Sequence, residues 1–315
     1  MIIPLTTSGS IKTLSQPECL WCNTPNLPAL TCFDRRFGIK GKREYRFCPN
    51  CCSYSISPAP SEAELKAWYH EFYALGSRVT TAFKSGFMYR LWRHVDGQDC
   101  LYELLKPGPL LDIGCGFGDL LAIAQGMGNE VWGQEFDPIS AEFSRNRGLQ
   151  VREEPISSGD FPQKYFTNVV LSQVIEHVQA PVKLLKDILP LLTDHGQIIV
   201  STPNPHGIFA RLYKNGWAGW HTPFHLCMVS KKALVKAAQE LGLVCIRTNT
   251  NSPGYWFFLN LYSYLYGKEG HVNYKAFEKT PYLKRRLLVL SLAPFLRTID
   301  FLGLGDNTII VMQKR

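Results

Sequence analysis

Residues 110–121 have the types and spacing of a ligand-binding loop. A short apolar run ends in Asp112, and glycines follow at alternate positions, Gly114, Gly116 and Gly118, before a new apolar periodicity begins. This pattern predicts a strand, a tight turn and a helix. Glycine lets the backbone adopt positive φ and lets a ligand approach without meeting a Cβ atom. The free N–H groups at the start of the helix favour an anionic group.

A second acidic residue stands where the next strand is expected to end. Residues 130–135 read as that strand, and Glu135 lies about 20 residues beyond the glycines, where a carboxylate can accept hydrogen bonds from ribose hydroxyls. Asp137-Pro138 follows as an N-cap and a first-turn proline. The alternative for Glu135 is a solvated acid at a strand end.

The loop and the acid together resemble the first motifs of the Rossmann-like S-adenosylmethionine-dependent methyltransferases. Loop N–H groups suit the methionine carboxylate of that cofactor, and Asp112 suits its ammonium. From this resemblance we expect that a side chain added at Gly114 would occupy the place of the cofactor. The alternatives are a structural turn or a loop for another nucleotide. The resemblance implies these cofactor-binding residues: Asp112, Gly114, Cys115, Gly116, Gly118, Glu135, Phe136 and Gln173.

The segment 173–178 follows a buried β-branched run, residues 168–172. It resembles the Glu-His segment of a methyltransferase subfamily that includes quinone and sugar enzymes, although Thr167 stands where that subfamily usually has Asp. His177 would then lie beside the reacting atom of the acceptor. An imidazole could remove a proton there, since it titrates near neutrality. Alternatively, Glu176 and His177 fix the loop, and methyl transfer proceeds by alignment alone.

The segment 217–226 is dense in aromatic rings and imidazoles. In similar proteins a segment of this kind faces the acceptor pocket, and tryptophan faces stack on flat or amphipathic ligands such as sugar rings. His225 is therefore a second candidate base and His221 a third. The alternative is a packed lid with hydrogen-bonded histidines. The acceptor that the resemblance favours is a sugar, nucleotide-linked or in a surface glycan, methylated on oxygen or carbon. A quinone-like or other small molecule comes next.

Two cysteine pairs lie near the N-terminus, Cys19-x-x-Cys22 and Cys48-x-x-Cys51, with 25 residues between them. Two such knuckles can complete a tetrahedral S4 site for structural zinc. The polar, basic segment between the pairs has few residues able to make a core, so the metal would supply much of the folding energy. The alternatives are a redox pair or chance, and Cys52 could replace Cys51 as a ligand.

The elements that position these residues predict an α/β fold. We expect a Rossmann-like, seven-stranded, mostly parallel sheet with helices on both faces, preceded by a zinc-binding module at residues 1–60. Residues 61–106 are expected to be a helical cover and residues 107–315 the methyltransferase domain. A capping box at Ser61 opens one helix with Phe72 on its apolar face, and a second helical stretch is expected over 78–105. The remaining strands are expected at 149–152, 197–201, 243–250 and 307–313, and further helices at 138–147, 181–192 and 230–241.

An aromatic-rich insertion at about 251–305 separates the last two strands. It could line a pocket, make a dimer face or rest on a membrane surface. We favour plain burial, because Arg297 and Asp300 interrupt its apolar segment. The sequence does not predict the oligomeric state.

The net charge of +8 is unevenly distributed. Residues 1–60 carry +4, residues 61–267 carry −1 and residues 268–315 carry +5. These ends permit an anionic partner, but no Lys/Arg-rich run is interleaved with stacking aromatics, so we expect no nucleic-acid partner. An RNA-modifying enzyme or a non-catalytic RNA-binding protein that uses the zinc module is the alternative from another class. Because no signal-peptide pattern or membrane span is evident, we expect a cytoplasmic protein with reduced cysteines.

Overall fold

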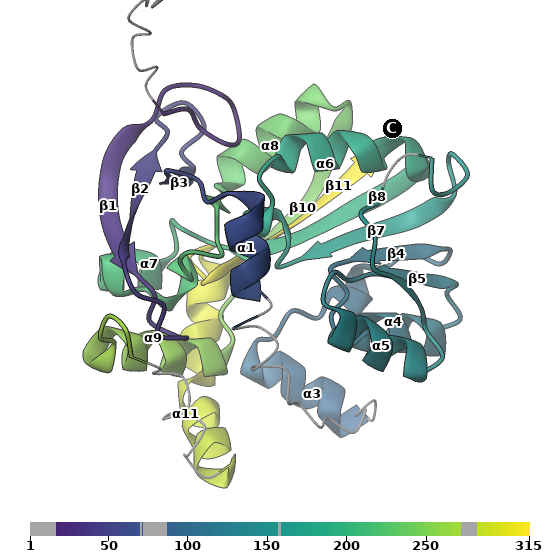
Figure 1. The fold of residues 1–315 in the computed structure, drawn as a ribbon. Helices are drawn as coiled ribbons and strands as arrows, with labels where there is room; N and C mark the ends of the chain where they lie inside the picture. The colour runs from purple at the N-terminus through teal and green to yellow at the C-terminus, as the bar shows by residue number, and fades with distance from the viewer. Residues whose placement is uncertain (1–16, 70, 72–86, 157–158, 272–281) are drawn as a thin grey trace, which may run out of the picture.

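The computed structural model describes all residues except 1–16, 70, 72–86, 157–158 and 272–281 (Figure 1). The predicted apolar position Phe72 and the first part of the helical stretch expected over 78–105 lie outside the described residues. The described part of that stretch forms a helix and then a short 3-10 turn. None of the described helices is long and apolar enough to cross a membrane.

The described chain forms two sheets. The smaller has the strand order β1-β2-β3-β9, and the larger has the order β10-β11-β8-β7-β4-β5-β6. The strands are β1 (Leu27–Phe33), β2 (Lys42–Phe47), β3 (Tyr54–Ser57), β4 (Leu110–Ile113), β5 (Val131–Gln134), β6 (Gln150–Arg152), β7 (Phe166–Ser172), β8 (Leu192–Pro203), β9 (Cys227–Met228), β10 (Leu243–Asn251) and β11 (Asn307–Lys314).

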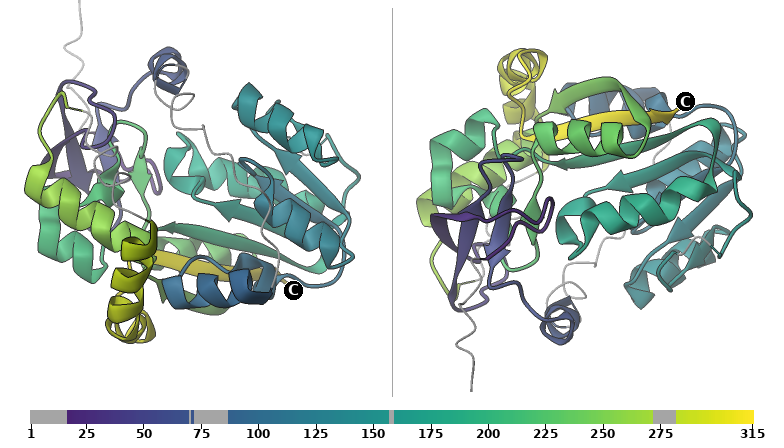
Figure 2. Two further views of the ribbon diagram at one scale, coloured as in Figure 1. Left: turned by 90° about the horizontal axis from the view of Figure 1, so that it is seen from below. Right: turned by 90° about the horizontal axis from the view of Figure 1, so that it is seen from above.

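The helices connect these strands and lie over both faces of the larger sheet (Figure 2). The α-helices are α1 (Glu62–Trp68), α3 (Phe87–Asp96), α4 (Asp119–Gly126), α5 (Pro138–Asn146), α6 (Pro181–Ile188), α7 (Ile208–Tyr213), α8 (Lys231–Glu240), α9 (Gly254–Tyr266) and α11 (Tyr282–Phe301). The 3-10 turns are η2 (Leu101–Leu104), η3 (Ile175–His177), η4 (Leu189–Leu191), η5 (Lys214–Gly216) and η6 (Ala218–Trp220).

The larger sheet has seven strands, and the predicted fold class is confirmed. The pairs β4–β5, β5–β6, β4–β7 and β7–β8 are parallel. Strand β11 inserts between β8 and β10 and is antiparallel to both. The carboxyl ends of β4, β5 and β7 therefore meet at one edge of the sheet, where ligands of open α/β sheets bind.

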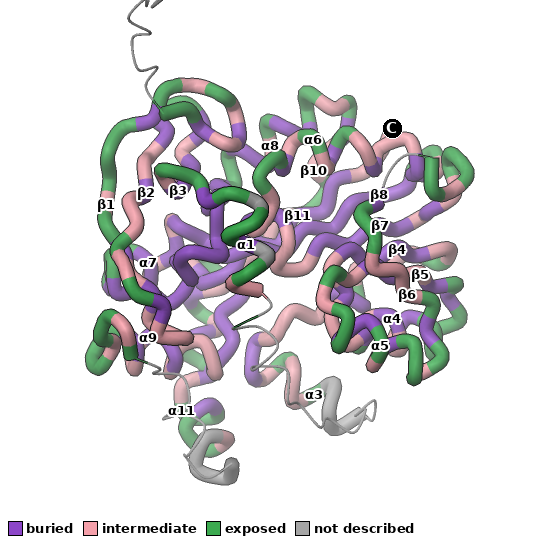
Figure 3. The backbone as a smooth tube through the Cα atoms, viewed as in Figure 1, coloured by how far each residue is buried: buried purple, intermediate pink, exposed green. Residues whose placement is uncertain are grey.

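The central strands are buried on both faces, as Figure 3 shows. Neighbouring residues alternate between two cores because side chains along a strand point to opposite faces. Val169 packs with α6 and α8, whereas Val170 packs with η2 and α4. The helix predicted over 181–192 ends instead at Ile188, and η4 follows with Pro190 inside it. Proline cannot donate an α-helical hydrogen bond, which explains the early end.

The N-terminal segment packs against the rest of the chain. Its sheet is completed by β9, which pairs with β3, and Cys19 and Cys51 belong to the same apolar core as α6 and α8. Between the cysteine pairs the buried hydrophobic residues are Cys32, Ile39 and Tyr45, in agreement with the expectation of few core residues there. The expected domain boundaries at residues 60 and 106 stay predictions.

The insertion at 251–305 contains helices α9 and α11. Plain burial holds for one face of α11 only: Val289 and Leu296 are buried, whereas Leu287 and Phe295 are exposed. Arg297, which interrupts the apolar pattern, fixes α11 against the preceding parts of the chain.

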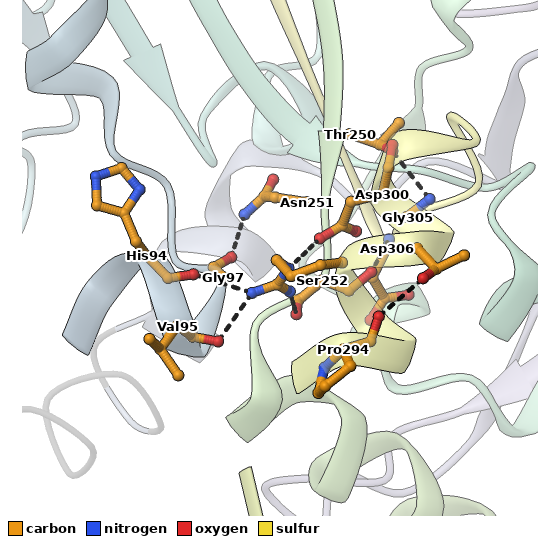
Figure 4. A network of polar contacts seen from close by, with 12 residues as sticks. His94, Val95, Gly97, Thr250, Asn251, Ser252, Pro294, Asp300, Gly305 and Asp306 are labelled. Carbon is orange, nitrogen blue, oxygen red and sulfur yellow. Dashed lines mark hydrogen bonds and ion pairs between the residues drawn. The ribbon is translucent and has the colours of Figure 1, made fainter. Parts of the chain in front are cut away.

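Figure 4 shows a network of polar contacts that joins Val95 and Gly97, at the end of α3 and just after it, to Asn251, Ser252 and Asp300. The Arg297 guanidinium donates to the backbone carbonyls of Val95 (3.0 Å) and Ser252 (2.6 Å) and to the Asp300 carboxylate (2.9 Å). The Asn251 amide donates to the Gly97 carbonyl at 2.8 Å and also to Asp99. The insertion therefore holds the end of α3 and the residues after it, which border the cavity described next.

Candidate functional site

A cavity of about 270 Å³ lies at the carboxyl end of β4. It is bordered by the glycine loop, by the start of α4 and by residues that precede β4. The lining residues are Arg93, Asp99, Leu101, Tyr102, Asp112, Gly114, Cys115, Gly116, Phe117, Asp119, Leu120, Ile123 and Ser172. Four of the predicted cofactor-binding residues are therefore brought together here.

Asp112 is the buried acid of this cavity. Its side-chain Oδ1 has no hydrogen-bond partner among the described residues. Burial, followed by the charge of Glu135, raises the pKa of Asp112 to about 8. An isolated carboxylate in such surroundings is costly, and a ligand ammonium would offset that cost. The residues present fit the ammonium end of S-adenosylmethionine.

The glycine loop has the backbone conformation that the sequence predicts, with φ of +70° at Gly114 and +54° at Gly116. The expectation that a side chain at Gly114 would occupy the cofactor's place stays a prediction, but such a side chain would also meet a neighbour in the protein. A Cβ atom there would lie 2.5 Å from Cγ2 of Val174, so the clash is with the protein itself. A Cβ atom at Gly116 would meet nothing within 4 Å. Gly116 is thus the glycine whose missing side chain leaves open space for a ligand.

Glu135 lies beside the glycine loop. One carboxylate oxygen accepts from the Gly116 N–H and the other from the Asp137 N–H, both at 2.8 Å. Burial raises the pKa of Glu135, and these two backbone bonds oppose that rise. Each oxygen has a second lone pair, so the carboxylate can still accept from ribose hydroxyls.

The other predicted cofactor residues do not border the cavity. Phe136 is 64 % exposed next to Glu135. The Gln173 amide lies 3.3 Å from the Ser201 hydroxyl, and its backbone N–H donates to the Ser201 carbonyl. A Cβ atom at Gly118 would lie 2.4 Å from Cδ1 of Leu149, so this glycine serves the packing of the loop. Their roles with the cofactor stay predictions.

Sequence reasoning missed the residues that border the cavity from the chain before β4. Arg93 on α3 donates to the Asp99 carbonyl at 2.7 Å, and the Asp99 carboxylate accepts from Ser201 and Asn251. Burial raises the pKa of Asp99. No local pattern marks these residues, because their positions depend on contacts with β8 and β10.

We expect Glu135→Ala to weaken cofactor binding by about 1–3 kcal/mol, the cost of leaving hydrogen-bonding partners unpaired. Calorimetric titration with S-adenosylhomocysteine measures this change. The same truncation at Glu142, an exposed residue of α5, is the control and should bind like the wild type. Wild-type affinity in Glu135→Ala, or tighter binding of a nicotinamide dinucleotide, would refute the assignment.

Three histidines gather beyond the carboxyl ends of β7 and β8. The imidazole centroids of His177 and His225 are 4.6 Å apart, and those of His221 and His225 are 4.9 Å apart. The Tyr69 hydroxyl lies 2.7 Å from His177 Nδ1, and Phe224 packs against Tyr69 edge-on. The structure therefore brings together the candidate bases that the sequence places 48 residues apart.

The surroundings of these imidazoles disfavour their charged form. Burial is the main cause, and it lowers the pKa of His177 to about 4 and the pKa values of His221 and His225 well below their usual range. Glu176 is also buried; its Oε2 accepts from the Thr202 hydroxyl at 2.9 Å, and burial raises its pKa to about 8.

The histidine cluster is close to the cofactor cavity along the chain. Ser172 borders the cavity, Val174 covers Gly114, and His177 ends the turn that follows. The tryptophans of the 217–226 segment agree with the alternative of a packed segment. Trp217 and Trp220 are buried, and their indole N–H groups donate to Asp306 and to the Lys214 carbonyl.

The four N-terminal cysteines form a compact cluster. Their Sγ atoms all lie within 4.8 Å of one another, with Cys19–Cys51 at 3.6 Å and Cys22–Cys48 at 3.5 Å. Zinc at about 2.3 Å from each sulfur in a tetrahedron requires separations of about 3.8 Å. The donor set suits zinc. Cys52 is not among the four residues of this cluster.

A larger cavity of about 670 Å³ lies between α8, β10 and the end of α11. It is bordered by Arg211, Lys231 and Lys232 together with Phe301, and it contains none of the predicted site residues. We assign the reaction to the smaller cavity, because the glycine loop and the buried acids are there.

The comparisons with known proteins agree with this geometry. A family model described as a methyltransferase domain matches residues 87–248, just over half of the chain. No curated protein matches the sequence.

Several solved structures are similar to this chain. An S-adenosylmethionine-dependent methyltransferase from Archaeoglobus fulgidus is 17% identical over 73% of this chain and 100% of its own, with a TM-score of 0.46. Another from Mesorhizobium loti is 13% identical over 74% and 100%, with a TM-score of 0.47. Geranyl diphosphate C-methyltransferase from Streptomyces coelicolor A3(2) is 15% identical over 69% and 77%, with a TM-score of 0.46.

The strand order, the glycine loop with its buried acid and the family match together identify the protein. The chain belongs to the methyltransferase domain family and is an S-adenosylmethionine-dependent methyltransferase.

Proposed function

We propose that this enzyme methylates a sugar, nucleotide-linked or part of a surface glycan, on oxygen or carbon. The observation that carries the proposal is the cluster of neutral imidazoles, a tyrosine hydroxyl and a buried carboxylate beyond β7 and β8. These groups can hydrogen-bond hydroxyls, and the partly exposed ring of Phe37, 5.5 Å from His221, offers an apolar face.

S-adenosylmethionine supplies an electrophilic methyl group when it is bound. Asp112 would hold its ammonium, the loop N–H groups its carboxylate and Glu135 its ribose. His177 and His225 assist the removal of the acceptor's proton.

The acceptor class is tested by transfer of a labelled methyl group. The enzyme is incubated with labelled S-adenosylmethionine and, separately, with sugar nucleotides, glycan extracts, quinone analogues and cellular RNA. Label is expected in a sugar nucleotide or glycan, and added RNA should neither compete nor accept label. Transfer to RNA with none to sugars would overturn the proposal, and transfer only to quinone analogues would replace the sugar with the second acceptor class.

We also propose that Cys19, Cys22, Cys48 and Cys51 bind one structural zinc ion. The support is the close approach of four thiols in two Cys-x-x-Cys knuckles. A site closed by four sulfurs leaves no position for a substrate, so this zinc would stabilise the fold and take no part in the chemistry.

A further inference from the structure

Three side chains of the acceptor region lie close together. Proton removal by an imidazole would not need a carboxylate at this place. Glu176, His177 and His225 each offer a ligand atom, and these atoms all lie within 4.8 Å of one another. Two of them come from the turn after β7, and the third comes from the loop before β9. The backbone N–H of Leu226 donates to the Glu176 carbonyl at 2.7 Å, which fixes the two segments together.

Both imidazoles present a free lone pair. His225 Nδ1 lies 2.7 Å from the Gly219 carbonyl oxygen, and His177 Nδ1 lies 3.1 Å from the Phe224 carbonyl oxygen. A carbonyl oxygen can only accept, so the Gly219 contact places the His225 ring proton on Nδ1. We assign the same tautomer to His177, whose Nδ1–H then faces both the Phe224 carbonyl oxygen and the Tyr69 hydroxyl oxygen, which lies 2.7 Å away. Each Nε2 then keeps its lone pair. Metal-binding histidines are oriented in this way by a backbone carbonyl on the second ring nitrogen.

The carboxylate supplies the third donor. Glu176 Oε2 accepts from Thr202, whereas Oε1, although buried, has no hydrogen-bond partner among the described residues. A buried carboxylate oxygen without a donor is unfavourable, and a cation would satisfy it. The three donors are thus two neutral imidazole nitrogens and one carboxylate oxygen.

We propose that Glu176, His177 and His225 bind one divalent first-row transition-metal ion, with positions left open for the acceptor oxygen. Two imidazoles and one carboxylate form a set that holds such ions with open positions. The ion would polarise the acceptor hydroxyl and make its proton easier to lose. The polarisation of the hydroxyl rests on the proposed function, methyl transfer to a hydroxyl-bearing acceptor. Binding of the ion does not depend on that function.

The group transfer balances without an oxidant or reductant. With the ion bound, His177 and His225 would be its ligands and not the bases. The acceptor hydroxyl, made more acidic by the ion, would lose its proton to water, and its oxygen would form a bond to the methyl carbon. The carbon–sulfur bond breaks with its electron pair on sulfur, so the sulfonium becomes a neutral thioether.

Arg36, with Nη1 3.3 Å from His221 Nδ1, is positively charged and opposes a bound cation. We therefore expect an ion that exchanges and must be supplied.

Manganese(II) distinguishes this site from the cysteine cluster, because oxygen and nitrogen ligands suit it and thiolates do not. The whole chain, with its cysteine-bound zinc retained, is titrated with Mn²⁺ and free Mn²⁺ is followed by electron paramagnetic resonance. One Mn²⁺ per chain is expected. Glu176→Gln should weaken Mn²⁺ binding at least tenfold, and the same change at the exposed Glu154 should leave it unchanged.

Affinity for S-adenosylhomocysteine shows whether each variant is folded. If Glu176→Gln fails to fold, His177→Asn is the second variant and should also bind Mn²⁺ at least tenfold more weakly. The inference is overturned if the wild type binds no Mn²⁺, or if a folded variant binds it as the wild type does.

Activity separates this inference from the proposed function. Mn²⁺ binding without any sugar methylation would support the metal site and refute the acceptor class. Sugar methylation at an undiminished rate after mild chelation, in protein that binds no Mn²⁺, would refute the metal site and support the acceptor class.

Discussion

Turnover is expected to fall about 10²–10⁴-fold when His177 is replaced by asparagine, with cofactor affinity unchanged. His177 is the least buried of the three clustered histidines, and it ends the turn that begins next to the cofactor cavity. Asparagine keeps a polar group of similar reach but offers no basic nitrogen. The loss should appear in kcat, because the imidazole acts on the proton that leaves during methyl transfer.

The matched control is His195→Asn. His195 is exposed, lies outside the cluster and has φ of +67°, a conformation that asparagine tolerates. It should retain wild-type turnover. His225→Asn tests the second candidate and should lose turnover as His177→Asn does. Full activity in both cluster variants would leave alignment of the methyl group as the mechanism.

Much of the fold was predictable because its signals are local. The capping box at Ser61 forms as expected, with its N–H 2.8 Å from Glu64 Oε2. The Asp137 side chain accepts from the Ser140 N–H at the start of α5, and Ser230 caps α8. Caps, glycines and buried apolar runs each act within a few residues, so a single sequence records them.

The surroundings of the site were less predictable because they depend on packing between distant segments. Tyr69 reaches His177 across 108 residues of sequence, and nothing near either residue indicates the partner. Aromatic density in the 217–226 segment suggested a ligand-facing pocket, yet its tryptophans are core residues. An aromatic-rich segment can line a ligand pocket or fill a core. Here Trp220 packs against Tyr45, a residue far away in the sequence.

Removing one zinc ligand is expected to have the second large effect. Cys48→Ser should reduce zinc from about one ion per chain to well below one and destabilise the N-terminal sheet. In small modules structural zinc supplies much of the folding free energy, so its loss should open the N-terminal sheet first. Zinc analysis of purified protein and thermal unfolding measure these two changes.

The loss should extend to catalysis, because the cysteine cluster supports the histidine loop. Tyr45 of the same sheet donates its hydroxyl proton to the His225 carbonyl at 2.7 Å, and the Ile56 N–H donates to the Leu226 carbonyl at 2.9 Å. Strand β9, which follows directly, completes that sheet. If the two Cys-x-x-Cys turns lose their structure, these hydrogen bonds no longer have a fixed geometry. His225 is then no longer held in position.

The cofactor cavity lies on β4 and on the chain before it, so S-adenosylhomocysteine should still bind to Cys48→Ser with wild-type affinity while turnover falls at least tenfold. Cys52→Ser is the control: Cys52 adjoins Cys51 but is not one of the four clustered thiols, so this variant should keep its zinc and its activity. If the Cys52→Ser variant loses its zinc and a Cys51→Ser variant keeps it, Cys52 is the ligand in place of Cys51. A Cys48→Ser protein that has lost its metal and still turns over at the wild-type rate would separate the cysteine cluster from catalysis.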